Sequence, residues 1–308
     1  MRTLRIATRA SRLAMVQCGL VAEALRAAMP GLNIEIINIS TQGDRNRQSP
    51  LWKIERTGFF TSELERALLE GRADVAVHSY KDLPTQPAEG LRISAVFERK
   101  HPEDVLVSSK PIRSLEELTK GVVVGTSSPR RMAQVKHIRP DLKTEPIRGN
   151  VETRIRKAEE GQVDAVILAR AGLERLGLQD RIRFTFDPSM FVPAPAQGAL
   201  AIQTRDQDTD IIELVRQVHD EKTAHAAAIE RTVLAGLHPG CHAPVGVFAE
   251  LNDRMVRLVA MVADVSGMPY IKKELSGAVD ESTRLADEMI SRLLSDGAET
   301  IIRDAETT

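Results

Sequence analysis

The sequence predicts an α/β protein with two similarly built lobes around a cleft, followed by a small α+β domain. Twice, at residues 4–29 and 121–138, a short apolar strand runs into a polar turn that opens a helix. A second internal repeat aligns Gly71–Asp82 with Gly161–Gly172 without gaps. In both segments a helix ends in Glu-Gly and an aspartate precedes a buried strand. From Glu221 onward, an alanine-rich helix, an alternating strand and an amphipathic helix indicate the α+β design.

Length, charge and cysteine content limit the possible classes. A chain of 308 residues is long for one hydrophobic core, so we expect two or three domains. Its 42 basic and 43 acidic residues give a net charge of -1, which argues against a nucleic-acid-binding protein. Two distant cysteines, Cys18 and Cys241, argue against a disulfide framework and indicate a reducing compartment. Without a recognisable signal peptide or membrane-spanning run, we expect a cytoplasmic protein with no membrane partner.

The first lobe opens with a strand at Leu4–Ala7, and the polar turn after it carries Arg9 and Ser11. Amide groups at the start of the next helix, together with the Arg9 guanidinium, predict an anion site. Residues 40–58 are polar and irregular, and a loop of that length is commonly either a lid, as expected here, or a disordered segment. The other expected elements are a helix at 13–29, strands at 34–39, 75–77 and 91–96, and a helix at 60–70.

The stretch Val75–Pro84, VAVHSYKDLP, is the feature around which the first lobe is organised. Its apolar strand ends in a run of polar side chains that includes Lys81 and Asp82. Ligands of open α/β sheets bind at such strand ends, which makes these two residues candidates for a site. A carboxylate close to a proline is also typical of an ordinary turn, so the stretch alone leaves both interpretations open.

Two crossings connect the lobes in the predicted chain path. A charged, proline-ended segment at 98–102 leads into the second lobe, and residues 191–198, stiffened by prolines, lead back. Residues 199–203 then add a strand to the first lobe, which makes that lobe discontinuous. The second lobe is expected to hold a helix at 111–119 and a strand at 122–124. The predicted domains are residues 1–98 with 198–218, residues 99–197, and residues 219–308.

The second lobe is rich in arginine where its elements begin and end. Ser127 or Ser128 can cap a helix that has Pro129 at its first position. Arg130 and Arg131 lie in the first turn, where cations oppose the helix dipole. This position favours an anion-binding interpretation over solvated surface charge. Further arginines of this lobe are Arg148, Arg154, Arg156, Arg170 and Arg175.

The third domain carries Cys241 in the loop LHPGCHAPVG. A cysteine in a Gly/Pro loop is less typical of inert core packing than Cys18, which lies inside a helix, so a reactive role is weighed against a packing role. His238, Cys241 and His242 have no second matching cluster, so no metal site is predicted. The expected elements are a helix at 221–235, a strand at 255–265 and a helix at 283–294.

Six ordered segments spanning nearly the whole chain carry a resemblance to a known family: VHSYKDLP, GTSSPRR, RGNVETR, AGLERLGL, PAQGAL and PGCHAPVG. In this order they resemble the hydroxymethylbilane synthases, also called porphobilinogen deaminases. The resemblance implies two lobes like those of type II periplasmic binding proteins and a third domain bearing the cysteine. It also implies a dipyrromethane cofactor attached to Cys241 by a thioether, which serves as primer for four porphobilinogen molecules. A monomer with porphobilinogen as its substrate is expected.

The same resemblance assigns roles to individual residues. It implies that Asp82 is catalytic, with Lys81 beside it, and that both also contact the cofactor. It implies further cofactor contacts from Thr126, Ser128, Arg130 and Arg131. Substrate contacts are implied for Arg9, Ser11, Phe60, Arg148, Arg154, Arg175 and Gln197. Arg156 and Arg170 do not stand at family motif positions and are interpreted as structural. An arginine-rich lining suits this chemistry, because each porphobilinogen brings two carboxylates and guanidinium groups bind carboxylates bidentately.

Departures from the family and two rival functions remain open at this point. Thr57 stands where the family commonly has a lysine, and Lys53 can partly substitute for it. One rival is a non-catalytic two-lobed protein that binds an organic anion. The other is a thiol hydrolase that uses Cys241 as nucleophile and a nearby histidine as base.

Overall fold

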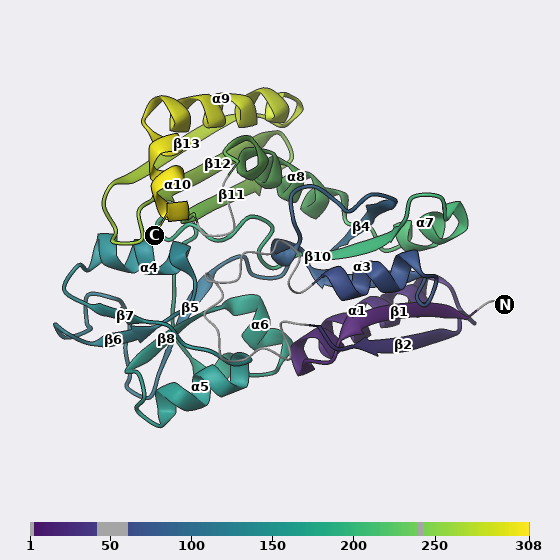
Figure 1. The fold of residues 1–308 in the computed structure, drawn as a ribbon, viewed down its shortest axis with the longest axis horizontal. Helices are drawn as coiled ribbons and strands as arrows, with labels where there is room; N and C mark the ends of the chain where they lie inside the picture. Colours follow the sequence, from purple (N-terminus) through teal and green to yellow (C-terminus); the bar gives the residue numbers. More distant parts are fainter. Residues whose placement is uncertain (1–2, 42–60, 239–242, 308) are drawn as a thin grey trace. The chain divides into compact units, whose positions relative to one another are not determined.

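The computed structural model describes residues 3–41, 61–238 and 243–307 (Figure 1). Their contacts form two compact units, which are described separately. Unit 1 contains the described residues of Met1–Gln48, Arg56–Lys100 and Gln197–His225, and unit 2 those of His101–Ala196 and Ala226–Thr308. No helix within the described ranges is long and apolar enough to cross a membrane.

Unit 1 contains a mixed five-stranded sheet in the order β2-β1-β3-β10-β4. The β1 strand pairs in parallel with β2 and β3, whereas β10 runs antiparallel to β3 and β4. The β10 strand confirms the predicted return of the chain to the first lobe. The strands are β1 (Leu4–Arg9), β2 (Ile34–Ile39), β3 (Val75–Ser79), β4 (Leu91–Phe97) and β10 (Leu200–Arg205).

Helices cover both faces of the unit 1 sheet. Val75 and Val77 share a buried cluster with residues of α1, while Ala76 joins a cluster with residues of α3. This division follows from the alternation of side chains along a strand. Cys18 is core packing, because it lies fully buried in the cluster on the α1 face, and this burial raises the pKa of its thiol to about 12. The helices are α1 (Arg12–Ala28), α3 (Ser62–Leu69), the one-turn η2 (Tyr80–Asp82) and α7 (Thr209–Arg216).

The first sheet of unit 2 repeats this plan in the order β7-β6-β8-β5-β9. Its β6 strand is parallel to β7 and β8, and β5 is antiparallel to β8. The strands are β5 (Asp104–Ser108), β6 (Val123–Gly125), β7 (Lys143–Glu145), β8 (Ala165–Ala169) and β9 (Ile182–Thr185). The helices are α4 (Pro129–Ile138), α5 (Val151–Glu159), α6 (Arg170–Arg175) and the one-turn η3 (Gln179–Arg181).

The helix predicted at 111–119 is wrong, because these residues form turns. Ile112, Leu115 and Leu118 are nevertheless buried in the core of this sheet. Their spacing of three residues is compatible with an amphipathic helix, but it also suits successive turns that each bury one side chain.

Two equivalent aspartates, Asp74 and Asp164, have the same structural role in the two repeated segments 71–82 and 161–172. Asp74 Oδ2 accepts from the backbone N–H of Arg5 at 2.9 Å, and Asp164 Oδ2 accepts from that of Val123, also at 2.9 Å. Each carboxylate therefore ties the start of one strand to the beginning of the neighbouring parallel strand. The two lobes differ beyond those strands, because Lys81 and Asp82 of unit 1 align with an alanine and a glycine of unit 2.

Unit 2 also contains an antiparallel sheet in the order β11-β12-β13, whose strands pack with three helices around one core. Its strands are β11 (Val245–Leu251), β12 (Met255–Ala263) and β13 (Tyr270–Ala278). Its helices are α8 (Glu221–Gly236), of which the residues from Ala226 onward belong to unit 2, α9 (Ser282–Ser295) and α10 (Ala298–Thr307), with the one-turn η4 (Val279–Glu281). Two mixed α/β sheets and this α+β part confirm the predicted fold class. The three domain boundaries stay a prediction.

Candidate active site

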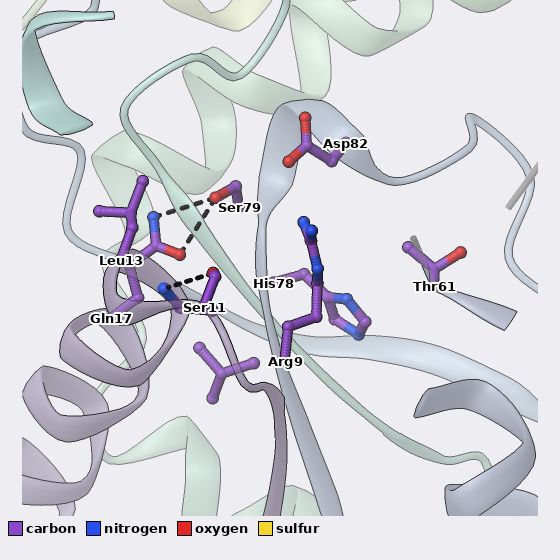
Figure 2. Close-up of a pocket in the computed structure, with 10 residues that line it drawn as sticks. Arg9, Ser11, Leu13, Gln17, Thr61, His78, Ser79 and Asp82 are labelled. Carbon is purple, nitrogen blue, oxygen red and sulfur yellow. Dashed lines mark hydrogen bonds between the residues drawn. The ribbon is translucent and has the colours of Figure 1, made fainter. Parts of the chain in front are cut away.

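A pocket in unit 1 lies at the carboxyl ends of two neighbouring parallel strands (Figure 2). Arg9 and Ser11 come from the end of β1, and Asp82 comes from the turn after β3. The pocket therefore brings together three residues that the sequence predicted for the site. Its other lining residues are Leu13, Ala14, Gln17, Thr61, Val77, His78 and Ser79.

Local hydrogen bonds hold the backbone around this pocket. Ser11 is the N-cap of α1, and its hydroxyl accepts from the Ala14 N–H at 3.3 Å. Gln17 of α1 contacts the end of β3, where its Nε2 lies 3.0 Å from Ser79 Oγ. The one-turn helix η2 then carries Asp82 to an exposed position two residues after buried Tyr80. The carboxylate is thus presented to ligand by a short, fixed turn rather than by a long loop.

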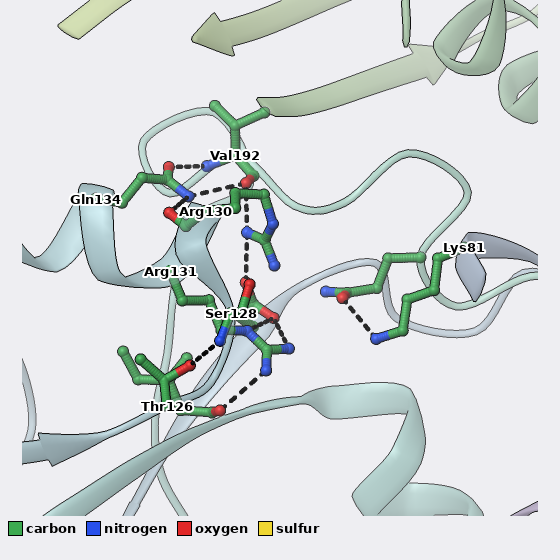
Figure 3. Close-up of polar contacts among 10 residues, drawn as sticks. Lys81, Thr126, Ser128, Arg130, Arg131, Gln134 and Val192 are labelled. Carbon is green, nitrogen blue, oxygen red and sulfur yellow. Dashed lines mark hydrogen bonds and ion pairs between the residues drawn. The ribbon is translucent and has the colours of Figure 1, made fainter. Parts of the chain in front are cut away.

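Lys81, the neighbour of Asp82, is positioned by the segment that returns to unit 1. Its Nζ donates to Gln197 Oε1 at 3.0 Å, a contact drawn in Figure 3. Gln197 is fully buried, and its backbone carbonyl accepts from Arg99 Nε at 2.9 Å. Two predicted site residues, Lys81 and Gln197, are therefore in direct contact, although 116 positions separate them in the sequence.

In unit 2, the turn from β6 into α4 forms as predicted. Ser128 is the N-cap residue and Pro129 occupies the first turn. The Ser128 N–H donates to Thr126 Oγ1 at 3.2 Å, and Ser127 Oγ donates to the Ile147 carbonyl at 2.7 Å. Thr126 and Ser128 are therefore neighbours at the start of α4, where backbone amides favour an anion.

Arg130 and Arg131 have an internal charge partner that the sequence did not predict. Asp104, at the start of β5, is fully buried between them. Its Oδ2 lies 2.8 Å from Arg130 Nη1, and its Oδ1 accepts from Arg131 Nη2 at 2.7 Å. Arg130 Nη1 also donates to the Val192 carbonyl at 2.6 Å (Figure 3). Asp104 was not predicted from the sequence, although an aspartate that opens an apolar strand is a signal for a buried charge partner.

This cluster still has an excess positive charge, since one carboxylate faces two guanidiniums. Burial alone would raise the pKa of Asp104, but the two arginines lower it well below its usual range. Burial lowers the pKa of Arg130 from its ordinary value. Arg130 Nη2 has no hydrogen-bond partner in the described part of the chain. One further carboxylate from a ligand would balance the charge of the cluster.

Three other predicted arginines of unit 2 have different surroundings. Arg148 is half-buried, and its Nε and Nη2 are buried without a hydrogen-bond partner among the described residues. Burial lowers its pKa from the ordinary value. Arg154 Nε donates to the Gly149 carbonyl at 2.8 Å, and Arg175 lies half-buried in the last turn of α6. The orphaned nitrogens of Arg148 are the donors that an incoming carboxylate would satisfy.

Arg156 and Arg170 have the structural surroundings that the sequence predicted. Arg156 forms an exposed ion pair with Glu160, and Arg170 pairs with Glu103 and Glu174. Two predicted site residues, Phe60 and Cys241, lie outside the described residues. No group of three metal-ligating side chains occurs in the ranges that the structure describes.

Family models match this chain over almost its full length. The model described as porphobilinogen deaminase, dipyromethane cofactor binding domain, matches residues 4–213, and the model of the porphobilinogen deaminase C-terminal domain matches residues 224–295. The chain belongs to the porphobilinogen deaminase family. Within that family, the first model spans both five-stranded sheets, and the second includes the position of Cys241.

Individual members of the porphobilinogen deaminase family are similar over the whole chain. The enzyme of that name from Maridesulfovibrio salexigens is 41% identical, with 98% of each chain covered. That from Desulforudis audaxviator is 44% identical, with 98% of this chain and 97% of the relative covered. Among solved structures, the periplasmic VFT2 domain of BvgS from Bordetella pertussis is 16% identical with a TM-score of 0.42, covering 70% of this chain and 86% of that one.

The residues of unit 2 fit the dipyrromethane cofactor of the porphobilinogen deaminase family. That cofactor carries carboxylate side chains, and the start of α4 offers excess positive charge. Arg148 adds buried guanidinium nitrogens without a protein partner in the described ranges. These observations come from the structure and agree with the cofactor that the family model names.

We expect Asp104→Asn to destabilise the protein by about 3–5 kcal/mol, because it leaves two buried guanidiniums without a compensating charge. The shift of the urea unfolding transition measures this loss. Asp180→Asn is the matched control, since Asp180 is an exposed partner of Arg181 and its loss should change stability by less than about 0.5 kcal/mol. Equal unfolding of both variants and wild type would contradict the assigned role of Asp104.

Proposed function

We propose that this chain deaminates four porphobilinogen molecules and couples them head to tail onto a dipyrromethane primer held by a thioether to Cys241. The finished linear tetrapyrrole, hydroxymethylbilane, is then released by hydrolysis for tetrapyrrole biosynthesis. The observation that carries this proposal is the unit 1 pocket, which places the Asp82 carboxylate and the Arg9 guanidinium at one edge of the sheet. Membership of the porphobilinogen deaminase family supports the same activity.

Asp82 is proposed to stabilise the positive charge that develops during deamination. Cleavage of the carbon–nitrogen bond of the aminomethyl group releases ammonia and leaves a cationic azafulvene. A carboxylate already oriented by the η2 turn stabilises such a cation better than water does, because no reorganisation is needed. Asp82 also lies where it can accept pyrrole N–H groups and assist proton transfer.

Cationic and polar side chains are proposed to hold the carboxylates of the substrate. Arg9 and Ser11 supply a guanidinium and a helix start in the same pocket as Asp82. Lys81, held by Gln197, supplies a compact charge beside the catalytic carboxylate. Further substrate contacts are proposed for Phe60, Arg148, Arg154, Arg175 and Gln197.

The start of α4 is proposed to hold the carboxylates of the cofactor. Thr126 and Ser128 offer hydroxyl and amide groups at the first turn. Arg130 and Arg131 share one internal carboxylate, which leaves charge for one from the cofactor. When bound, dipyrromethane supplies the nucleophilic pyrrole on which the chain grows. Lys81 and Asp82 are proposed to contact it as well.

We propose, in addition, a cytoplasmic monomer with the three domains 1–98 with 198–218, 99–197 and 219–308, and without nucleic-acid or membrane partners. The balanced charge of the chain supports the absence of a nucleic-acid partner. A non-catalytic organic-anion-binding protein is the alternative, and family membership over nearly the whole chain favours the enzyme over it.

Replacing the proposed catalytic carboxylate by its isosteric amide tests the function. Asp82→Asn should fold normally and slow the formation of hydroxymethylbilane from porphobilinogen by roughly 100- to 1,000-fold, because the fixed negative charge is lost. Asp253→Asn, at an exposed turn, is the control and should keep wild-type turnover. Normal turnover by Asp82→Asn would refute the proposed mechanism.

A second test concerns Arg148, whose buried Nε and Nη2 have no hydrogen-bond partner among the described residues. Arg148→Ala should lower kcat/KM for porphobilinogen by about tenfold or more, since a charge-assisted hydrogen bond contributes about 1.5–3 kcal/mol. Arg156→Ala is the control, because Arg156 is exposed and pairs with Glu160. If both variants have the same steady-state kinetics as the wild type, Arg148 is not part of the site.

A further inference from the structure

His78 lies at the pocket, but the reaction as described gives it no role. It is the fourth residue of β3, only 6% exposed, and lines the pocket with Arg9 and Asp82. Ser79 contacts Gln17 of α1 on one face of the strand, whereas the His78 ring reaches a residue of β10. In Figure 2 the imidazole lies beside the Arg9 side chain, with Thr61 nearby.

A chain of two hydrogen bonds defines the orientation of the imidazole. Glu65 Oε1 of α3 accepts from Gln203 Nε2 at 3.1 Å, and Gln203 Oε1 lies 3.0 Å from His78 Nε2. A carboxylate can only accept, so the amide nitrogen of Gln203 must face Glu65 and its oxygen must face His78. His78 therefore carries its proton on Nε2, and Nδ1 keeps a free lone pair.

The surroundings keep this imidazole neutral. Burial lowers the pKa of His78 to about 4, and the Arg9 guanidinium also opposes protonation, although the hydrogen bond to Gln203 acts in the other direction. His78 Nδ1 has no hydrogen-bond partner in the described part of the chain. The pocket thus contains a neutral acceptor of fixed tautomer, in addition to the charged Asp82.

We propose that His78 Nδ1 accepts a hydrogen bond from a pyrrole N–H of the bound substrate, and that Glu65 and Gln203 are positioning residues that hold the required tautomer. This inference rests on the proposed function. A pyrrole N–H is the donor that fits, because it is neutral and can lie close to Arg9. An ammonium group would be repelled by that guanidinium, and a carboxylate has no proton to donate to the lone pair.

Two substitutions of His78 separate substrate contact from a purely structural role. Asparagine places its amide at the position of Nδ1 and leaves Gln203 without its partner. Glutamine reaches the position of Nε2, which preserves the contact with Gln203 but removes the acceptor in the pocket. His78→Gln is expected to lower kcat/KM for porphobilinogen by about tenfold or more, while His78→Asn stays within a few-fold of the wild type. If the imidazole has only a structural role, His78→Asn should lower kcat/KM more than His78→Gln does.

A remote variant tests the positioning chain. Glu65→Gln can donate to Gln203 Oε1, so the Gln203 amide can turn and present its NH₂ group to His78 Nε2. The proton of His78 is then expected to move to Nδ1, which ¹⁵N NMR of labelled histidine detects. kcat/KM should fall about as far as in His78→Gln, although residue 65 does not line the pocket. Glu70→Gln, exposed beyond the end of the same helix, is the control and should change neither readout.

The outcomes separate this inference from the function on which it rests. No consumption of porphobilinogen by the wild type would overturn the proposed function and the inference with it. Wild-type turnover combined with equal kinetics of His78→Asn and His78→Gln would overturn the inference alone. An Nδ1–H tautomer in the wild type would do the same, and this NMR measurement decides even if a His78 variant fails to fold.

Discussion

The burial of two arginines at the start of α4 depends on the carboxylate of Asp104. Two guanidiniums buried at a helix start would repel each other and lose their hydration, at a cost that marginally stable domains rarely tolerate. One internal carboxylate makes their burial possible and still leaves the cluster positive. In the proposed function, a cofactor carboxylate would therefore meet preoriented guanidinium donors whose charge is not fully neutralised.

The two lobes share a scaffold but differ in chemistry. Asp74 and Asp164 tie equivalent strands together, so the beginnings of the neighbouring parallel strands are joined by the same kind of hydrogen bond in both lobes. Unit 1 follows its strand with lysine and aspartate, while the aligned positions of unit 2 are small residues. The carboxylate proposed to stabilise cations and the arginines proposed to hold anions thus lie on separate copies of one design.

Much of this arrangement was predictable because it depends on local sequence. The N-caps at Ser11 and Ser128, the strand before Asp82 and the return strand β10 all follow from residue patterns within a few positions. Pairings across the fold were not predictable. Asp104 meets arginines more than 25 residues away, and His78 meets Gln203 across 125 positions, so only the folded sheets bring them together. The helix predicted at 111–119 was wrong for a local reason, because regularly spaced apolar residues occur in successive turns as well as in a helix.

The proposed mechanism requires a covalent primer at Cys241, and the intact mass of the purified protein under denaturing conditions shows whether it is present. The wild type is expected to carry the mass of two linked pyrrole units, and Cys241→Ser is expected to carry none. A wild-type protein that has the unmodified mass, and keeps it after incubation with porphobilinogen, would contradict the account.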